Sequence, residues 1–222
     1  MPGTAATGVR LAELLGRLSL AFDIANGSPH GKVVRSVVLA VELGRLAGAT
    51  DAELHDAFWL SLLGHLGCTG LADEEGSLTA TPMSGSDEAA RAMFDTSVRL
   101  AQIVGAGPRI LSALTQRFER DVSGHLASDA LVLPICLSRI AHLAETAHQQ
   151  HGREAAVALV RGDASGRFDP GLAKVFVDGQ RELCASIEDP PHFGTWTKSR
   201  PSFRFASRSS RSSRACATSR TS

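Results

Sequence analysis

The side chains of this chain that could do chemistry are a few histidines and carboxylates, widely separated in the sequence. An apolar stretch leads into Gly64, His65 and Gly67, and several all-α metallohydrolases present a metal ligand in this way, at the end of an apolar helix. A metal centre in a helical bundle needs four or more histidine or carboxylate ligands that converge from different helices. The sequence offers only scattered candidates for such a centre: His30, His65, Glu119 and Glu145.

Each candidate also has a structural interpretation. His30 follows Pro29, so it could be a surface or capping histidine, and His65 could be a hydrogen-bonded core histidine. Glu145 lies three residues after His142, a spacing that permits joint metal ligation and equally an exposed pair on one helix face. We expect that pair to be exposed. His148 and His151 extend the same face, and the two glutamines between them indicate solvent.

The elements that must position these residues are predicted to be helices throughout. Apolar residues recur at helical spacing along most of the chain, and no period-two alternation is sustained. Thr50 and Glu53 form a capping-box pattern, and Asp169 before Pro170 is typical of a helix start. We expect an all-α helical bundle with loops at 67–85 and 121–131 and helices near 8–22, 30–47, 51–64, 87–104, 108–120, 132–150, 152–161 and 170–187.

Composition divides the 222 residues into two parts. Residues 190–222 hold 7 of the 23 Lys and Arg and no acidic residue, which leaves 16 basic against 23 acidic residues in 1–189. We therefore expect a helical domain over 1–189 and a Ser/Arg-rich disordered tail over 190–222. The tail could be a frameshifted read-through without a selected role, or a basic arm for nucleic acid or an anionic surface.

The remaining composition limits the location of the protein. Four widely spaced cysteines without a Cys-x-x-Cys pattern argue against a zinc knuckle or a disulfide framework, and we expect reduced thiols, Cys68 among them as a structural thiol. No apolar run is long enough for a membrane span, and no signal peptide is recognisable. The sequence predicts a cytoplasmic, bacterial-type protein that does not enter a membrane.

Three segments, in order and spacing, carry a resemblance that covers residues 28–180. The first is 29–35, in which Arg35 follows His30 by five residues. The second is the leucine-rich segment 62–68, and the third runs from Pro134 through 138–145 to 152–156 and 166–170. Together they resemble the HD-GYP branch of the HD phosphohydrolase superfamily. The resemblance implies an HD-domain-like helical scaffold with a metal-dependent phosphodiesterase site. Because the leucine-rich segment would lie on the central helix of that scaffold, we expect Leu62, Leu63 and Leu66 to be buried against Val37, Val41 and Ile140.

At the positions that would bind metal, this sequence departs from the family pattern. Gly64 and His65 stand where the family has His then Asp, and Glu145 replaces the late aspartate. Met93 stands where a helix histidine is expected. In the region of the paired histidines the chain has Arg117 and Phe118, and only Glu119 and Arg120 resemble the signature. His30 is matched. Because each metal ion needs several fixed donors, these departures from the family pattern lead us to expect no bound iron or manganese.

The sequence therefore predicts a catalytically degenerate signalling or scaffold domain, without catalytic residues or cofactors, whose vestigial cleft retains His30, His65 and Glu119. Its partners would be a nucleotide, a partner signalling domain or a second copy in a homodimer. The alternative is a metal-dependent phosphohydrolase that cleaves cyclic di-GMP with divalent iron or manganese held by His30, His65 and Glu145. A nucleic-acid binder is the least favoured class because the 1–189 body is acidic.

Overall fold

The computed structural model describes residues 11–25, 30–66, 87–123, 129–162 and 168–188. Within these ranges the chain forms nine helices and no strand, which confirms the all-α prediction. The helices are α1 (Leu11–Ala25), α2 (Lys32–Leu46), α3 (Asp51–Leu66), α4 (Asp87–Ile103), α5 (Pro108–Ser123), α6 (Asp129–His151), α7 (Arg153–Arg161), α8 (Pro170–Asp178) and α9 (Gln180–Glu188). The predicted loop 67–85 and tail 190–222 lie outside the described residues.

The predicted helix signals are present in the structure. The Thr50 backbone N–H donates to Glu53 Oε2 at 2.8 Å, and the Glu53 N–H donates to Thr50 Oγ1 at 3.4 Å, which is a complete capping box at the start of α3. Asp169 caps α8 by accepting from the Leu172 N–H at 2.9 Å. These local contacts explain why both helix starts were recognisable in the sequence.

Two predicted boundaries were wrong. The predicted loop 121–131 is helical at both ends, because α5 continues to Ser123 and α6 begins at Asp129 and contains Pro134. The predicted helix 170–187 is two helices, α8 and α9, that meet at Gly179. Gly179 is the C-cap of α8, and its N–H donates to the Val175 carbonyl at 2.9 Å.

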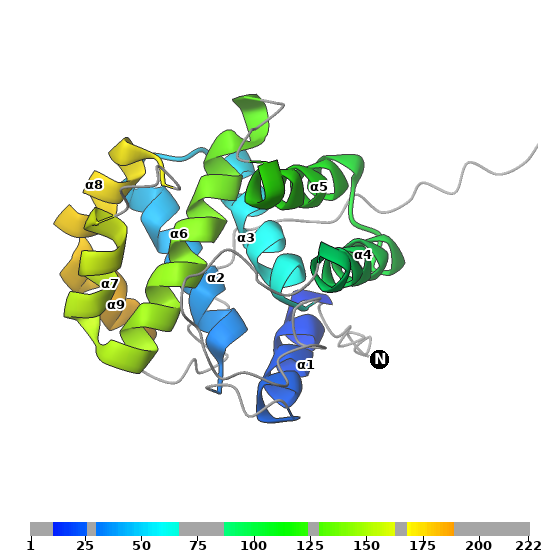
Figure 1. The fold of residues 1–222 in the computed structure, drawn as a ribbon, viewed down its shortest axis with the longest axis horizontal. Coiled ribbons are helices and arrows are strands. Elements are labelled where there is room, and N and C mark those ends of the chain that lie inside the picture. Colours follow the sequence, from blue (N-terminus) through cyan, green and yellow to red (C-terminus); the bar gives the residue numbers. More distant parts are fainter. Residues whose placement is uncertain (1–10, 26–29, 67–86, 124–128, 163–167, 189–222) are drawn as a thin grey trace, which may run out of the picture.

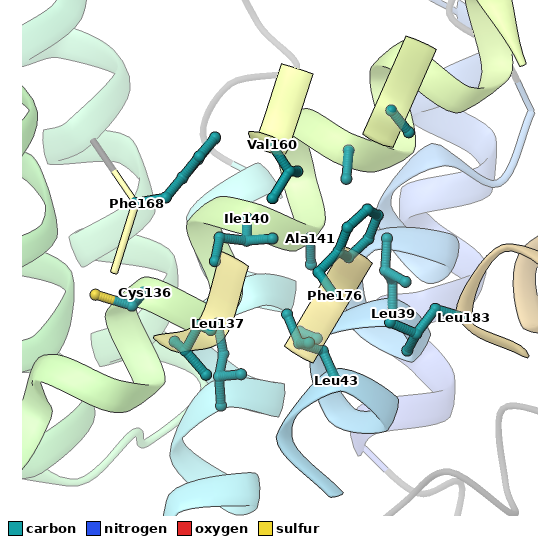
Figure 2. Packing of buried hydrophobic residues seen from close by; sticks show 14 of the residues in the cluster. Leu39, Leu43, Cys136, Leu137, Ile140, Ala141, Val160, Phe168, Phe176 and Leu183 are labelled. Atoms are coloured by element: carbon teal, nitrogen blue, oxygen red, sulfur yellow. The ribbon is translucent and has the colours of Figure 1, made fainter. Parts of the chain in front are cut away.

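Helices α2, α3 and α6 form the middle of the bundle, with α7, α8 and α9 on one side and α4 and α5 on the other (Figure 1). Helix α2 contributes side chains to two apolar clusters. Val37 and Val41 belong to the first cluster, which α2 shares with α3. Leu39 and Leu43 belong to the second cluster, which α2 shares with α6 and α8. Figure 2 shows the Phe176 ring in the second cluster among Leu39, Ala141 and Leu183. The central helices are therefore held on both faces.

The leucine-rich segment on α3 occupies the first cluster. Leu62 and Leu63 are fully buried and cluster with Val37 and Val41, as the sequence predicts. Ile140, which the sequence placed beside them, belongs to the second cluster instead. The cluster of Ile140 still includes one residue of α3, Ala57. The side chain of Leu66 lies outside the described residues.

Candidate functional site

The most deeply buried charged pair in the described residues joins α2 to α6. Arg35 Nε donates to Glu145 Oε1 at 2.8 Å, and the two side chains are only 6% and 1% exposed. A second guanidinium nitrogen, Nη1, donates to the backbone carbonyl of His30. Arg35 therefore connects the entry of α2 to the middle of the bundle.

The entry of α2 is shaped by Gly31 and Asp23. Gly31 has a φ of 84°, a left-handed conformation that favours glycine, and its N–H donates to Asp23 Oδ2 of α1 at 2.9 Å. Burial raises the pKa of Asp23, and hydrogen bonds from the Gly31 and Lys32 backbone oppose that rise. Asp23 thus caps α2 from a neighbouring helix, and this cap fixes where His30 and Arg35 lie.

Polar atoms at the Arg35–Glu145 pair are incompletely satisfied. Arg35 Nη2 and Glu145 Oε2 are buried and have no hydrogen-bond partner among the described residues. Burial raises the pKa of Glu145, and the charge and hydrogen bond of Arg35 oppose the rise. The resemblance would make Glu145 a metal ligand, but the carboxylate of Glu145 is already paired with the permanent positive charge of Arg35.

The structure places the sequence candidates in different ways. The side chain of His30 is exposed, and its backbone carbonyl, not its ring, meets Arg35. Glu145 was expected to be exposed, which is wrong, because residue 145 of α6 points into the bundle toward α2. The side chains of His65 and Glu119 lie outside the described part of the structure, as do those of Met93 and Arg117. The described residues contain no group of three or more His, Cys, Asp or Glu placed to hold a metal ion.

The histidines that follow Glu145 differ in exposure. His151 is exposed, as predicted, but His148 is half-buried. Its Nδ1 is buried without a partner among the described residues, and burial lowers the pKa of the ring below its ordinary value. The difference arises because α7 and α9 pack beside this end of α6 and cover one edge of it.

A second polar cluster, overlooked in the sequence, lies where α3 meets α5. Asp56 is 3% exposed, and its Oδ2 atom accepts a hydrogen bond from Arg109 Nε. On the other side, His55 Nδ1 lies 3.5 Å from the Asp56 Oδ1 atom. His55 Nε2 accepts the indole N–H of Trp59 at 3.1 Å, which assigns the ring proton to Nδ1 and directs it at Asp56. The adjacent residues His55 and Asp56 were the feature of the sequence that could have indicated this cluster. It was passed over because the resemblance placed the family's pair at Gly64 and His65.

The two clusters are separate. Because a short connection at 47–50 joins α2 to α3, the helices run antiparallel, and Asp56 lies nearer this connection than Arg35 does. At the rise of an α-helix the two residues differ by on the order of 10 Å along the bundle. His55 and Asp56 thus tie α5 to α3 and do not extend the Arg35–Glu145 site.

Replacing Asp56 with asparagine is expected to flatten the acid side of the stability profile. Burial would raise the pKa of Asp56, but the hydrogen bonds from His55 and Arg109 lower it further, below the ordinary 3.8. A carboxyl with a lowered pKa contributes stability above its unfolded pKa, and this contribution is lost as the pH falls through the folded value. Thermal unfolding of the wild type and Asp56→Asn between pH 6 and strong acid measures the difference. Parallel profiles below pH 3.8 would contradict this account.

Two cysteines in the described residues, Cys136 and Cys184, are buried. Burial raises the pKa of the Cys184 thiol to about 11, so the thiolate required of a nucleophile is scarce at neutral pH. Cys68 and Cys216 lie outside the described residues. None of the described helices is long and apolar enough to cross a membrane.

Comparisons with protein-family models, curated proteins and solved structures gave no match.

Proposed function

We propose that this chain is a catalytically inactive HD-GYP-like module that acts in signalling or as a scaffold. The observation that carries the proposal is the buried ion pair of Arg35 and Glu145, at 2.8 Å. Arg35 engages the carboxylate of Glu145, the residue that stands where the family has the metal-binding aspartate late in its sequence. The departures at Gly64 and His65 support the same reading.

The chemistry of a guanidinium explains why this pair favours a non-catalytic role. A metal ion in a phosphohydrolase both neutralises carboxylates and lowers the pKa of a bound water, so that hydroxide forms near neutral pH. Arginine is always charged and offers five N–H donors, but it has no coordination position for water. Arg35 can thus supply the positive charge that holds Glu145 in the bundle, without supplying a nucleophile.

The proposal predicts that the purified protein does not hydrolyse cyclic di-GMP. It is incubated with the nucleotide and manganese or ferrous iron, and the linear product is followed by chromatography, while bound metal is measured by elemental analysis. We expect no product above the enzyme-free control and less than stoichiometric metal. Binding of the nucleotide without turnover would agree with a signalling role.

The matched variants are His30→Ala and His151→Ala. Both replace an exposed histidine, but only His30 lies at the entry to the Arg35–Glu145 site. Turnover that disappears in His30→Ala and persists in His151→Ala would overturn the proposal in favour of the metal-dependent phosphodiesterase.

A further inference from the structure

The outward face of α1 is apolar. The exposed residues of this helix, among those whose side chains are described, are Leu14, Arg17, Leu18, Ala21 and Ile24. The three large apolar members are 53%, 41% and 67% exposed, in the order of the sequence. A surface helix normally carries polar residues on the face opposite its buried stripe, so an apolar outward face marks an interaction surface.

The buried face of α1 is already used by the bundle. Ala12 and Leu15 pack in the first apolar cluster, and Ser19 and Asp23 are also buried. At 100° per residue these four positions lie on the side of the helix opposite Leu14, Leu18 and Ala21. Figure 1 shows α1 at the edge of the bundle, against the ends of α2 and α3. The exposed stripe is therefore a second apolar face.

The spacing of the stripe fits another helix. Leu14, Leu18 and Ala21 follow one another by four and three residues, the 3.5-residue period at which two helices interdigitate along a seam. An isologous dimer needs only one such patch, because each copy offers the same surface to the other. The formal net charge of the full chain is zero, so no long-range repulsion opposes the approach of two copies.

We propose that α1 is a self-association surface through which two copies of this chain pair as antiparallel helices. When Leu14 faces Leu18 of the second copy, Arg17 of each copy lies within about half a helical turn of Glu13 of the other. The four charges then form a neutral group beside the seam. Glu13 and Arg17 lie on the same flank of the seam. A parallel pair would place these flanks on opposite sides of the seam, where the four charges cannot meet, so the charges favour the antiparallel arrangement. The inference does not depend on the chemistry at Arg35 and Glu145.

The test is the mass of the full chain in solution, measured by light scattering and by sedimentation equilibrium. We expect a concentration-dependent dimer, and Leu18→Asp should raise its Kd at least about tenfold, since a charge would enter the centre of the seam. The control is Ile103→Asp on α4, whose side chain is 80% exposed and outside the stripe. It should leave the Kd unchanged. Circular dichroism is used to check that both variants remain folded.

Charge reversal tests the orientation. Glu13→Arg and Arg17→Glu should each raise the Kd, and the double variant should restore it, because the antiparallel pair regains opposite charges. A wild-type chain that stays monomeric at high micromolar concentration, or a dimer that Leu18→Asp leaves intact, would overturn the inference. A double variant weaker than both single variants would overturn the antiparallel arrangement.

Discussion

The variant Leu63→Ala is expected to lose about 2–5 kcal/mol of unfolding free energy. Leu63 is fully buried on α3 and belongs to the cluster that contains Val37, Val41 and Leu62. The substitution removes apolar contacts and leaves a cavity that close-packed neighbours fill only in part. Urea titration followed by circular dichroism measures the change.

The control for this variant is Ile103→Ala, which truncates an 80% exposed side chain and should change the unfolding free energy by less than about 0.5 kcal/mol. A loss below about 1 kcal/mol in Leu63→Ala would mean that this segment of α3 is peripheral. The resemblance, which depends on a central helix here, would then lose its support.

The second large effect is expected at the buried ion pair. Arg35→Met should cost about 3–5 kcal/mol, because it leaves Glu145 as a charge inside the bundle without its counter-charge. The double variant Arg35→Met/Glu145→Met should recover most of this loss, since an apolar pair of similar volume needs no charge compensation. Denaturant unfolding of the two single variants and the double variant gives the coupling energy between the two residues.

The loss in Arg35→Met should also depend on pH. Arg35 opposes the rise of the Glu145 pKa, so its removal raises that pKa further. A carboxyl with a raised folded pKa contributes stability that is present below its unfolded pKa and is lost as the pH rises through the folded pKa. The variant should therefore be closest to wild type in acid and furthest from it at neutral pH.

The matched control on the same helix is Arg45→Met, because Arg45 pairs with Glu42 at the surface with 39% and 31% of the two side chains exposed. An exposed pair contributes about 1 kcal/mol or less. If Arg45→Met and Arg35→Met lost equal stability, the Arg35–Glu145 pair would not be the buried tie between α2 and α6 that the structure describes.

Sequence patterns predicted most of the helices because the information for a helix is local. The capping box at Thr50 and the cap at Asp169 are each complete within four residues. The boundary at Gly179 was not predicted, although Gly179 is the C-cap of α8 and its N–H donates to the Val175 carbonyl within the same turn.

The candidate site was predictable only in part. His30, Arg35 and Glu145 were singled out from the sequence, but their relation was not, since Arg35 and Glu145 are 110 residues apart. A glutamate with a histidine three residues before it is compatible with an exposed pair, and nothing local to residue 145 indicates that α2 covers it. Asp56 was missed for a different reason. The adjacent His55 was a local signal, but the resemblance placed the family's pair at Gly64 and His65, and the contact with Arg109 of α5 is not visible in the sequence.

The sequence by itself determined the class of the fold, the placement of most helices and the burial of the leucine-rich segment of α3. Periodicity and capping encode these features over one or a few turns. The tertiary structure decided that Glu145 is buried against Arg35, that α1 has a second apolar face, and that α2 contributes to two apolar clusters. These features depend on which helix faces lie against one another, and that choice is made by packing over the whole bundle, not by the order of residues within one helix.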